Sequence, residues 1–261
     1  MSPGADEEPT GGPDVRKLAR MNITVIGASG LIGTKVVELL TTAGHNVVAA
    51  SRQTGVDVLS GDGLTEALAA AEVLIDVTNS PSFADDEVLA FFTTSTTSLV
   101  TAASSTGVAH YVALSIVGID DLPDSGYLRA KVAQERLIVD SGLSYTIVRA
   151  TQFHEFAEAI TGSLIVGAEV RVPDGRIQPI AADDVAAEVA RIATAAPLNG
   201  VVNIGGPDKI TFAEMARIVL AKQGDSKPVV VDPEATYFGT PVDDDSLVTG
   251  ADGVLAPTPF R

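Results

Sequence analysis

Residues 22–33 read NITVIGASGLIG, and this stretch decides how the chain is expected to fold. Its opening residues are mostly β-branched, which is typical of a buried strand. Gly27, Gly30 and Gly33 follow at equal spacing, and glycines at such positions allow a tight turn. A helix is expected next, because apolar residues recur at helical spacing as far as a typical stop at Gly44.

The chain continues to alternate between strand and helix patterns as far as residue 150. Further strands are expected at residues 45–52, 55–59, 72–80, 110–118 and 144–150. Helices are expected between them, at residues 64–71, 86–105 and 125–141. This alternation predicts an α/β fold, with a doubly wound parallel sheet covered by helices on both faces.

One connection is too short for this pattern. Only a few residues separate the strands expected at 45–52 and 55–59, whereas a parallel crossover needs about a dozen or more. The usual helix is therefore expected to be missing, and residues 55–59 are expected to form a stub strand that crosses the end of the sheet.

The pattern changes after residue 150. Short strands and turns are expected at 164–184 and helices at 183–197 and 211–224, the last opening on a Thr–Glu capping box and stopping at a glycine. Residues 229–260 contain an acidic DDD and no Lys or Arg, and they are expected to be irregular and to lie on the surface.

These patterns predict one folded domain preceded by a tail. The first twenty residues are rich in Pro, Gly and acid and lack the apolar middle of a signal peptide, so residues 1–20 are expected to be a disordered tail. Residues 21–261 are expected to form a single dinucleotide-binding domain. Its core is expected at about 21–150 and 178–195, and a small substrate lobe at about 151–177 and 196–261.

Composition excludes several classes of function. The chain has 261 residues, of which 46% are hydrophobic, and a formal net charge of −17. Such acidity opposes nucleic acid binding, which rests on Lys and Arg. There is no cysteine and there are only three histidines, so neither a disulfide framework nor a metal site is expected. No apolar run is long enough for a membrane span, and a cytoplasmic location is expected.

The glycine turn predicts a dinucleotide site. Backbone N–H groups and the positive end of the following helix can receive a diphosphate at such a turn. The alternative is a merely compact turn. The residues expected to face the diphosphate are Gly27, Ser29, Gly30, Leu31, Ile32 and Gly33.

The residues after the strand at 45–52 favour NADP over NAD. An acidic residue there would bind the ribose 2′-hydroxyl, whereas Ser51 and Arg52 suit a 2′-phosphate. An ordinary surface arginine is the alternative. Asp57 and Val58 are expected to meet the adenine. A further set, expected to face the crevice unless they are only turn residues, is Thr78, Asn79 and Ser80.

Several motifs occur in the order seen in short-chain dehydrogenases/reductases, which the chain resembles over about residues 22–220. The glycine spacing and two later segments are most similar to the atypical, NmrA-like branch. The motifs are VIGASGLIG (25–33), DVTNS (76–80), ALSIVG (113–118), YLRAK (127–131), SGLSYTIVRATQF (141–153) and QPIAADDVA (178–186). The short second connection resembles that of the dTDP-4-dehydrorhamnose reductases.

This resemblance implies a Rossmann-type sheet with a small C-terminal substrate lobe and NADP(H) as cofactor. In catalytic members it implies hydride transfer to a small carbonyl, quinone or imine-like acceptor. Other members bind the nucleotide without turnover and act as redox sensors. A nucleotide-sugar reductase or epimerase is a third possibility. The expected partner is a small-molecule substrate, and the chain is expected to be a monomer or a homodimer.

Ser115, Tyr127 and Lys131 are the residues expected to carry the chemistry. Tyr127 and Lys131 stand four residues apart, so a helix places them on one face. Lys131 is expected to bind the ribose hydroxyls and to lower the pKa of the phenol, making Tyr127 a general acid. Ser115 is expected to hydrogen-bond the same substrate oxygen. The alternative is that Tyr127 is simply an exposed residue in a first helical turn.

The segment RATQF that follows the strand at 144–150 is expected to flank the nicotinamide. Ala150 and Thr151 are expected to contact the cofactor, and Gln152 and Phe153 to shape the substrate pocket. His154 is expected to be a plain pocket or surface residue, and no role is assigned to Tyr237.

Overall fold

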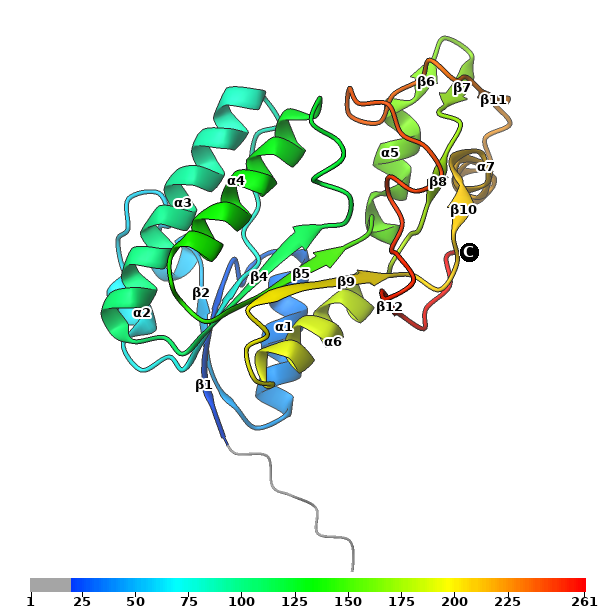
Figure 1. The fold of residues 1–261 in the computed structure, drawn as a ribbon. Helices are drawn as coiled ribbons and strands as arrows, with labels where there is room; N and C mark the ends of the chain where they lie inside the picture. Colours follow the sequence, from blue (N-terminus) through cyan, green and yellow to red (C-terminus); the bar gives the residue numbers. More distant parts are fainter. Residues whose placement is uncertain (1–19) are drawn as a thin grey trace, which may run out of the picture.

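A computed structural model describes residues 20–261 of the chain, so the expected tail lies outside the described residues apart from Arg20. Its core is a seven-stranded sheet in the order β12-β9-β5-β4-β3-β1-β2 (Figure 1), and all of its strand pairs are parallel. The strands are β1 (Asn22–Ile26), β2 (Asn46–Ala50), β3 (Val73–Asp76), β4 (His110–Ile116), β5 (Tyr145–Ala150), β9 (Gly200–Gly205) and β12 (Val254–Leu255). The predicted doubly wound α/β fold is confirmed.

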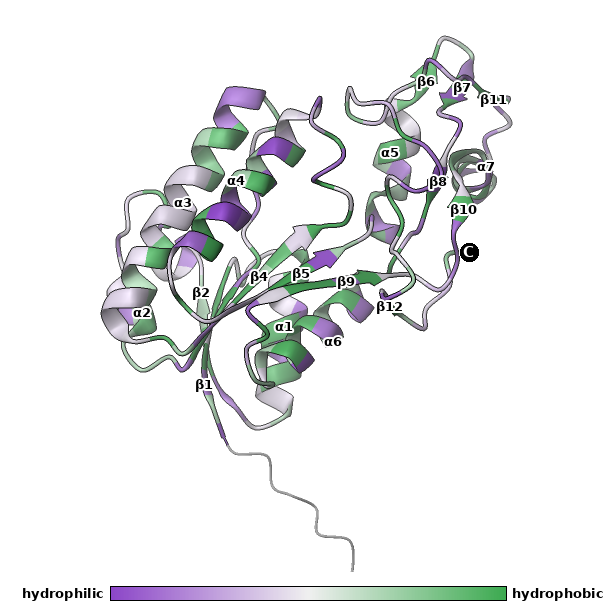
Figure 2. Cartoon of the chain, viewed as in Figure 1, coloured by the Kyte–Doolittle hydropathy of each residue, from purple (hydrophilic) through white to green (hydrophobic). Residues whose placement is uncertain are grey.

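Helices cover both faces of this sheet, as Figure 1 shows. One face packs on α1 (Leu31–Thr42) and α6 (Ala182–Ala193). The other packs on α2 (Leu64–Leu68), α3 (Asp85–Thr106) and α4 (Gly126–Asp140). The central strands β1, β3, β4 and β5 are buried over most of their length and are therefore largely apolar, whereas the edge strands β2 and β12 are mostly exposed. Figure 2 colours the chain by the hydropathy of each residue.

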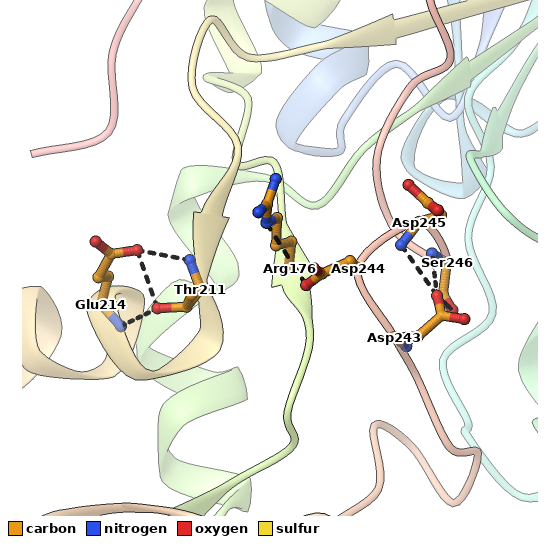
Figure 3. A network of polar contacts seen from close by, with 7 residues as sticks. All are labelled: Arg176, Thr211, Glu214, Asp243, Asp244, Asp245 and Ser246. Atoms are coloured by element: carbon orange, nitrogen blue, oxygen red, sulfur yellow. Dashed lines mark hydrogen bonds and ion pairs between the residues drawn. The ribbon is translucent and has the colours of Figure 1, made fainter.

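A smaller lobe stands beside the carboxyl ends of β4 and β5 (Figure 1). It has its own apolar core. Its elements are α5 (Ala157–Ser163), β6 (Ile165–Val166), β7 (Glu169–Val172), β8 (Arg176–Ile177), β10 (Ile210–Thr211), α7 (Phe212–Gln223) and β11 (Val229–Val231). The capping box predicted for α7 is present, since Glu214 N donates to Thr211 Oγ1 at 3.1 Å and Thr211 N donates to Glu214 Oε2 at 2.8 Å (Figure 3).

The stub strand expected at residues 55–59 is not formed. Asp57 instead forms local turns. Leu59 N donates to its carboxylate at 2.8 Å and Gly61 N donates to its carbonyl at 2.9 Å. Only a short 3-10 helix, Arg52–Thr54, follows β2. The expected connection without a helix is therefore wrong, because the chain passes from β2 to β3 through α2, and β2 is the edge of the sheet.

Residues 229–260 are more ordered than predicted. They contain β11 and β12, and Leu247 is fully buried in the core of the lobe. β9 and β12 extend the main sheet beyond β5, so these two strands belong to the core and not to the lobe. Sequence pattern missed this because β12 has only two residues, and its strand state depends on the pairing with β9.

The order of the strands places one crevice at a defined point. From β1 the chain adds β2 on one side and then returns to add β3 on the other. Ligands bind at such reversals, at the carboxyl ends of the strands. Within residues 20–261, none of the helices has the length and apolarity to cross a lipid bilayer.

Candidate functional site

The glycine turn joins the carboxyl ends of three strands. Gly27 has a φ of +84°, which favours glycine, and a Cβ there would lie only 2.8 Å from the carbonyl oxygen of Val77 beyond β3. Gly27 N donates to Ala50 O of β2 at 3.1 Å. A Cβ on Gly33 would collide with the carbonyl of Gly27. The backbone is packed so closely at Gly27 and Gly33 that neither position has room for a side chain.

The helix that leaves this turn has an open N-terminus. Gly30 is its N-cap and offers no side-chain hydrogen bond, and no acidic residue lies in the first turn. The first-turn N–H groups have no partner inside the helix, and they lie at the positive end of its dipole. Ser29 and Leu31 are exposed there, while Ile32 and Gly33 are buried. These features fit a diphosphate.

The four residues predicted to meet the adenosine end follow β2, and none of them lines a cavity that begins at Leu59. Ser51 and Arg52 follow β2, and Arg52 is exposed and outside the ion pairs formed within the described chain. The carboxylate of Asp57 is held by its own turn, and Val58 is half-buried. That cavity, of about 390 Å³, is lined by Leu59, Ser80, Pro81, Ser82, Glu87, Ala90, Phe91 and Thr94.

The three residues predicted to face the crevice after β3 point in different directions. The hydroxyl of Thr78 donates to Asp76 at 2.7 Å. The side-chain oxygen of Asn79 accepts a hydrogen bond from the Tyr127 phenol at 2.7 Å. Ser80 lines the cavity. Thr78 therefore orders the turn, and Asn79 holds the candidate acid.

Tyr127 lies at the start of α4 among aromatic rings. Its ring centroid is 5.6 Å from that of Phe83 and 5.9 Å from that of Phe92. Burial raises the pKa of Tyr127 to about 12, and the hydrogen bond with Asn79 offsets part of this rise. The expected lowering of this pKa by Lys131 is wrong for this structure.

Lys131 makes its hydrogen bonds with groups other than the phenol. Its Nζ donates to the carbonyl of Leu114 at 2.8 Å and to the side-chain oxygen of Gln134, and it lies 4.5 Å from the centre of the Phe92 ring. Only 3% of Lys131 is exposed. Burial lowers its pKa to about 8, although the charges of Asp76 and Glu135 act in the opposite direction.

Sequence reasoning missed the buried carboxylate of Asp76, which positions the Gln134 side chain that Lys131 binds. The carboxylate of Asp76, 1% exposed, accepts hydrogen bonds from Gln134 Nε2 at 3.0 Å and from the Tyr111 hydroxyl at 3.0 Å. Asp76 thus binds the same Gln134 that accepts from Lys131. Two signals were available, an acid ending the apolar run VLID and a glutamine three residues after the lysine.

Unpartnered polar groups lie at the carboxyl ends of β4 and β5. The hydroxyls of Ser115 and Thr151 and both amide atoms of Gln152 are buried and make no hydrogen bond of ordinary geometry among residues 20–261, although the Gln152 amide lies close enough to the Tyr237 phenol to lower the pKa of that phenol. Each such group costs about 1–3 kcal/mol unless a ligand or water satisfies it. These residues were predicted to contact cofactor or substrate, and their unmet hydrogen bonds fit that expectation.

The neighbours of these residues are packed more conventionally. Ala150 lies in the core. Phe153 is half-buried and stacks on Phe156 with ring centroids 5.6 Å apart. His154 packs against Phe260, and burial lowers its pKa. Phe153 thus packs against the main core, and its predicted role in the substrate pocket stays a prediction.

The C-terminal segment also reaches this region, which sequence reasoning did not foresee. Tyr237 is buried against Phe212 of α7, and burial raises its pKa. The next residue, Phe238, has its ring nearly parallel to that of Phe83, with ring centroids 6.5 Å apart. Farther along, Asp243 holds Ser246 through its carboxylate and Asp244 pairs with Arg176 at 3.5 Å, as Figure 3 shows.

The fold and the glycine turn define an α/β protein with a nucleotide site at the reversal point of a Rossmann-type sheet. The chain belongs to the NAD(P)H-binding family, whose profile matches residues 27–196. Five of the six motifs that resemble those of atypical short-chain dehydrogenases/reductases lie entirely within this matched region, and the first, at residues 25–33, overlaps its start.

One curated relative is the chloroplastic divinyl chlorophyllide a 8-vinyl-reductase of Cucumis sativus, 29% identical over 90% of this chain. The chain spans 62% of the length of that relative.

Among solved structures, MoeE5 in complex with UDP-glucose and NAD superposes with a TM-score of 0.69 at 21% identity, covering 92% of this chain and 94% of that one. The dTDP-4-dehydrorhamnose reductase of Bacillus anthracis in complex with NADP gives 0.67 at 14% identity, covering 88% and 89%. Both show the fold that this chain shares.

Proposed function

We propose that this protein is an NADP(H)-dependent oxidoreductase that acts on a small carbonyl, quinone or imine-like acceptor. The observation that carries the proposal is the set of unpartnered polar groups on Ser115, Thr151 and Gln152, at the edge of the sheet where such proteins bind their ligands. The name of the Cucumis sativus relative, a reductase, supports the same type of reaction.

Arg52 and Ser51 support NADP as the cofactor. The guanidinium of Arg52 is exposed and can offer several donors to a 2′-phosphate. The turn at Gly27 and the open N-terminus of α1 would hold the diphosphate through backbone amides. No acidic residue is then required at the ribose. The anionic cofactor would be bound by Arg52 and by the backbone N–H groups of the glycine turn, although the protein as a whole is acidic.

Bound NADPH would supply a hydride. Tyr127 would donate a proton to the acceptor atom, because its phenol remains neutral at physiological pH. Ser115 would hydrogen-bond the same atom with its free hydroxyl. An ammonium has three N–H groups, and Lys131 uses two of them on Leu114 and Gln134. The third remains for a ribose hydroxyl.

NADPH oxidation tests this proposal, measured by absorbance against quinones, aldehydes, ketones and imines. Tyr127→Phe should lower kcat by about 10²–10⁴-fold, the range for loss of a general acid. Tyr145→Phe is the matched control, since Tyr145 lies at the opposite end of β5. If both variants kept the parent rate on an active substrate, Tyr127 would not be the proton donor.

A redox sensor that binds NADP(H) without turnover is the second candidate. The raised pKa of Tyr127 favours it, because a phenol with a pKa of about 12 is a weak acid. Tight NADPH binding with no oxidation by any acceptor in the panel would support the sensor against the enzyme.

A further inference from the structure

Two exposed aromatic rings stand together at the edge of the proposed site. Phe83, in the loop between β3 and α3, is 65% exposed, and Phe238, in the C-terminal segment, is 55% exposed. Their planes are within 5° of parallel and their centroids are 6.5 Å apart. Single exposed rings are common on protein surfaces, but two parallel rings from distant segments form a defined apolar feature.

These rings continue inward to the polar groups of the site. Phe83 lies 5.6 Å from Tyr127, the phenol held by Asn79. Phe238 lies 4.6 Å from Tyr237, and the Gln152 amide lies close enough to Tyr237 to act on its pKa. Aromatic walls that lead to a few convergent polar groups are typical of a site for a flat, largely apolar molecule.

The backbone at Phe238 is sterically disfavoured. Phe238 has a φ of +47°, in the left-handed region that a bulky residue rarely adopts. A tight turn maintains it, in which Tyr237 N donates to Thr240 O at 2.8 Å and Thr240 N donates to Tyr237 O at 3.1 Å. Such strain persists where the surroundings impose it and is frequent at ligand sites. Here it holds an apolar ring in the solvent, opposite Phe83.

The charges around this region disfavour an anionic substrate. The chain carries a formal net charge of −17, and three arginines on α4, β5 and β8 are paired with carboxylates, whereas Arg136 of α4 and Arg217 of α7 form no ion pair within the described chain. Arg129 pairs with Asp85, Arg149 with Glu135 and Asp120, and Arg176 with Asp244.

We propose that Phe83 and Phe238 determine substrate specificity by clamping the faces of an uncharged, planar, conjugated ring. The two rings can separate to admit such a molecule, because their mutual contact is a single aromatic pair and both are largely exposed. Each then exchanges one aromatic contact for another. The inference deepens the proposed function, since it concerns the acceptor of the same site.

The test measures binding, so that it does not depend on turnover. 1,4-Naphthoquinone is titrated by calorimetry into the protein saturated with NADP⁺, where no reduction can occur. The double variant Phe83→Leu/Phe238→Leu should raise the Kd of the quinone about tenfold, and Phe83→Tyr/Phe238→Tyr should stay near the parent value. Leu198→Ala, at an apolar residue exposed to 60% in the connection between α6 and β9, is the matched control.

Two results would overturn the clamp. One is an unchanged Kd in the double leucine variant, and the other is UDP-glucose binding more tightly than the quinone to the parent protein. Affinity for NADP⁺, measured in each variant, reports whether the fold is intact. If quinone binding depends on both rings while no acceptor oxidises NADPH, the oxidoreductase proposal fails and the clamp stands.

Discussion

Asp76 is expected to be the most sensitive charged position in the core. Its two carboxylate oxygens accept four hydrogen bonds, at 3.0 Å and 2.7 Å from the backbone and hydroxyl of Thr78 and at 3.0 Å each from Tyr111 and Gln134. Asp76→Asn keeps the shape but replaces one accepting oxygen by a donor. Whichever way the amide turns, one backbone N–H or one Gln134 N–H then faces another donor.

The size of the loss follows from these contacts. Two hydrogen bonds to a charged group are lost, each worth about 1.5–3 kcal/mol, and a hydroxyl can rotate to recover one of them. The free energy of unfolding should therefore fall by about 2–4 kcal/mol. For a domain of this size, this corresponds to a fall in Tm of about 5–15 °C.

Urea unfolding followed by circular dichroism measures this effect, with Asp62→Asn as the matched control because Asp62 is exposed. The charge of Asp76 raises the pKa of Lys131, which burial holds at about 8. The variant should therefore also lower that pKa further and weaken NADP⁺ binding at pH 8. If Asp76→Asn were within 0.5 kcal/mol of the control (about the scatter of ordinary surface substitutions), the buried network would not stabilise the fold.

Three further changes test other parts of the site. Gly27→Ala should cost about 2–4 kcal/mol and abolish nucleotide binding, whereas Gly44→Ala, also at positive φ but with open space around it, should cost only about 1–2 kcal/mol in urea melts. Arg52→Ala should weaken NADP⁺ far more than NAD⁺ in calorimetry, and equal losses would refute the 2′-phosphate assignment. The contribution of Tyr127 to stability should be full below pH 10 and be lost between pH 10 and about 12, because burial raises the pKa of Tyr127 only in the folded state; Tyr127→Phe should remove this part of the alkaline fall in unfolding curves, while the part due to the raised pKa values of Tyr111 and Tyr237 remains.

The sequence by itself determined the place of the glycine turn and, apart from the strand expected at 55–59, the strands and helices of the first 150 residues. These features are local. A buried parallel strand is a short apolar run, and Gly27 is required by its own φ and by the approach of Val77. The ends of α7 are equally local, because Thr211 and Glu214 bind each other and Gly224 adopts the left-handed conformation itself.

One prediction failed where local turn hydrogen bonds competed with strand pairing. The apolar residues around Asp57 have a strand pattern, but the carboxylate and carbonyl of Asp57 bind nearby N–H groups and keep the segment in turns. β12 was missed for the opposite reason, since its two residues are a strand only through their pairing with Ile204 and Gly205.

Only the tertiary structure decided the chemistry around Tyr127. Helical spacing puts Tyr127 and Lys131 on one face of α4. It does not predict which side chains of α3, or of the loop after β3, contact that face. Phe92 and Gln134 draw the ammonium inward, and Asn79 holds the phenol. The direction of a long side chain, and with it the pKa of its neighbour, depends on burial and on partners far away in the chain, which no local pattern encodes.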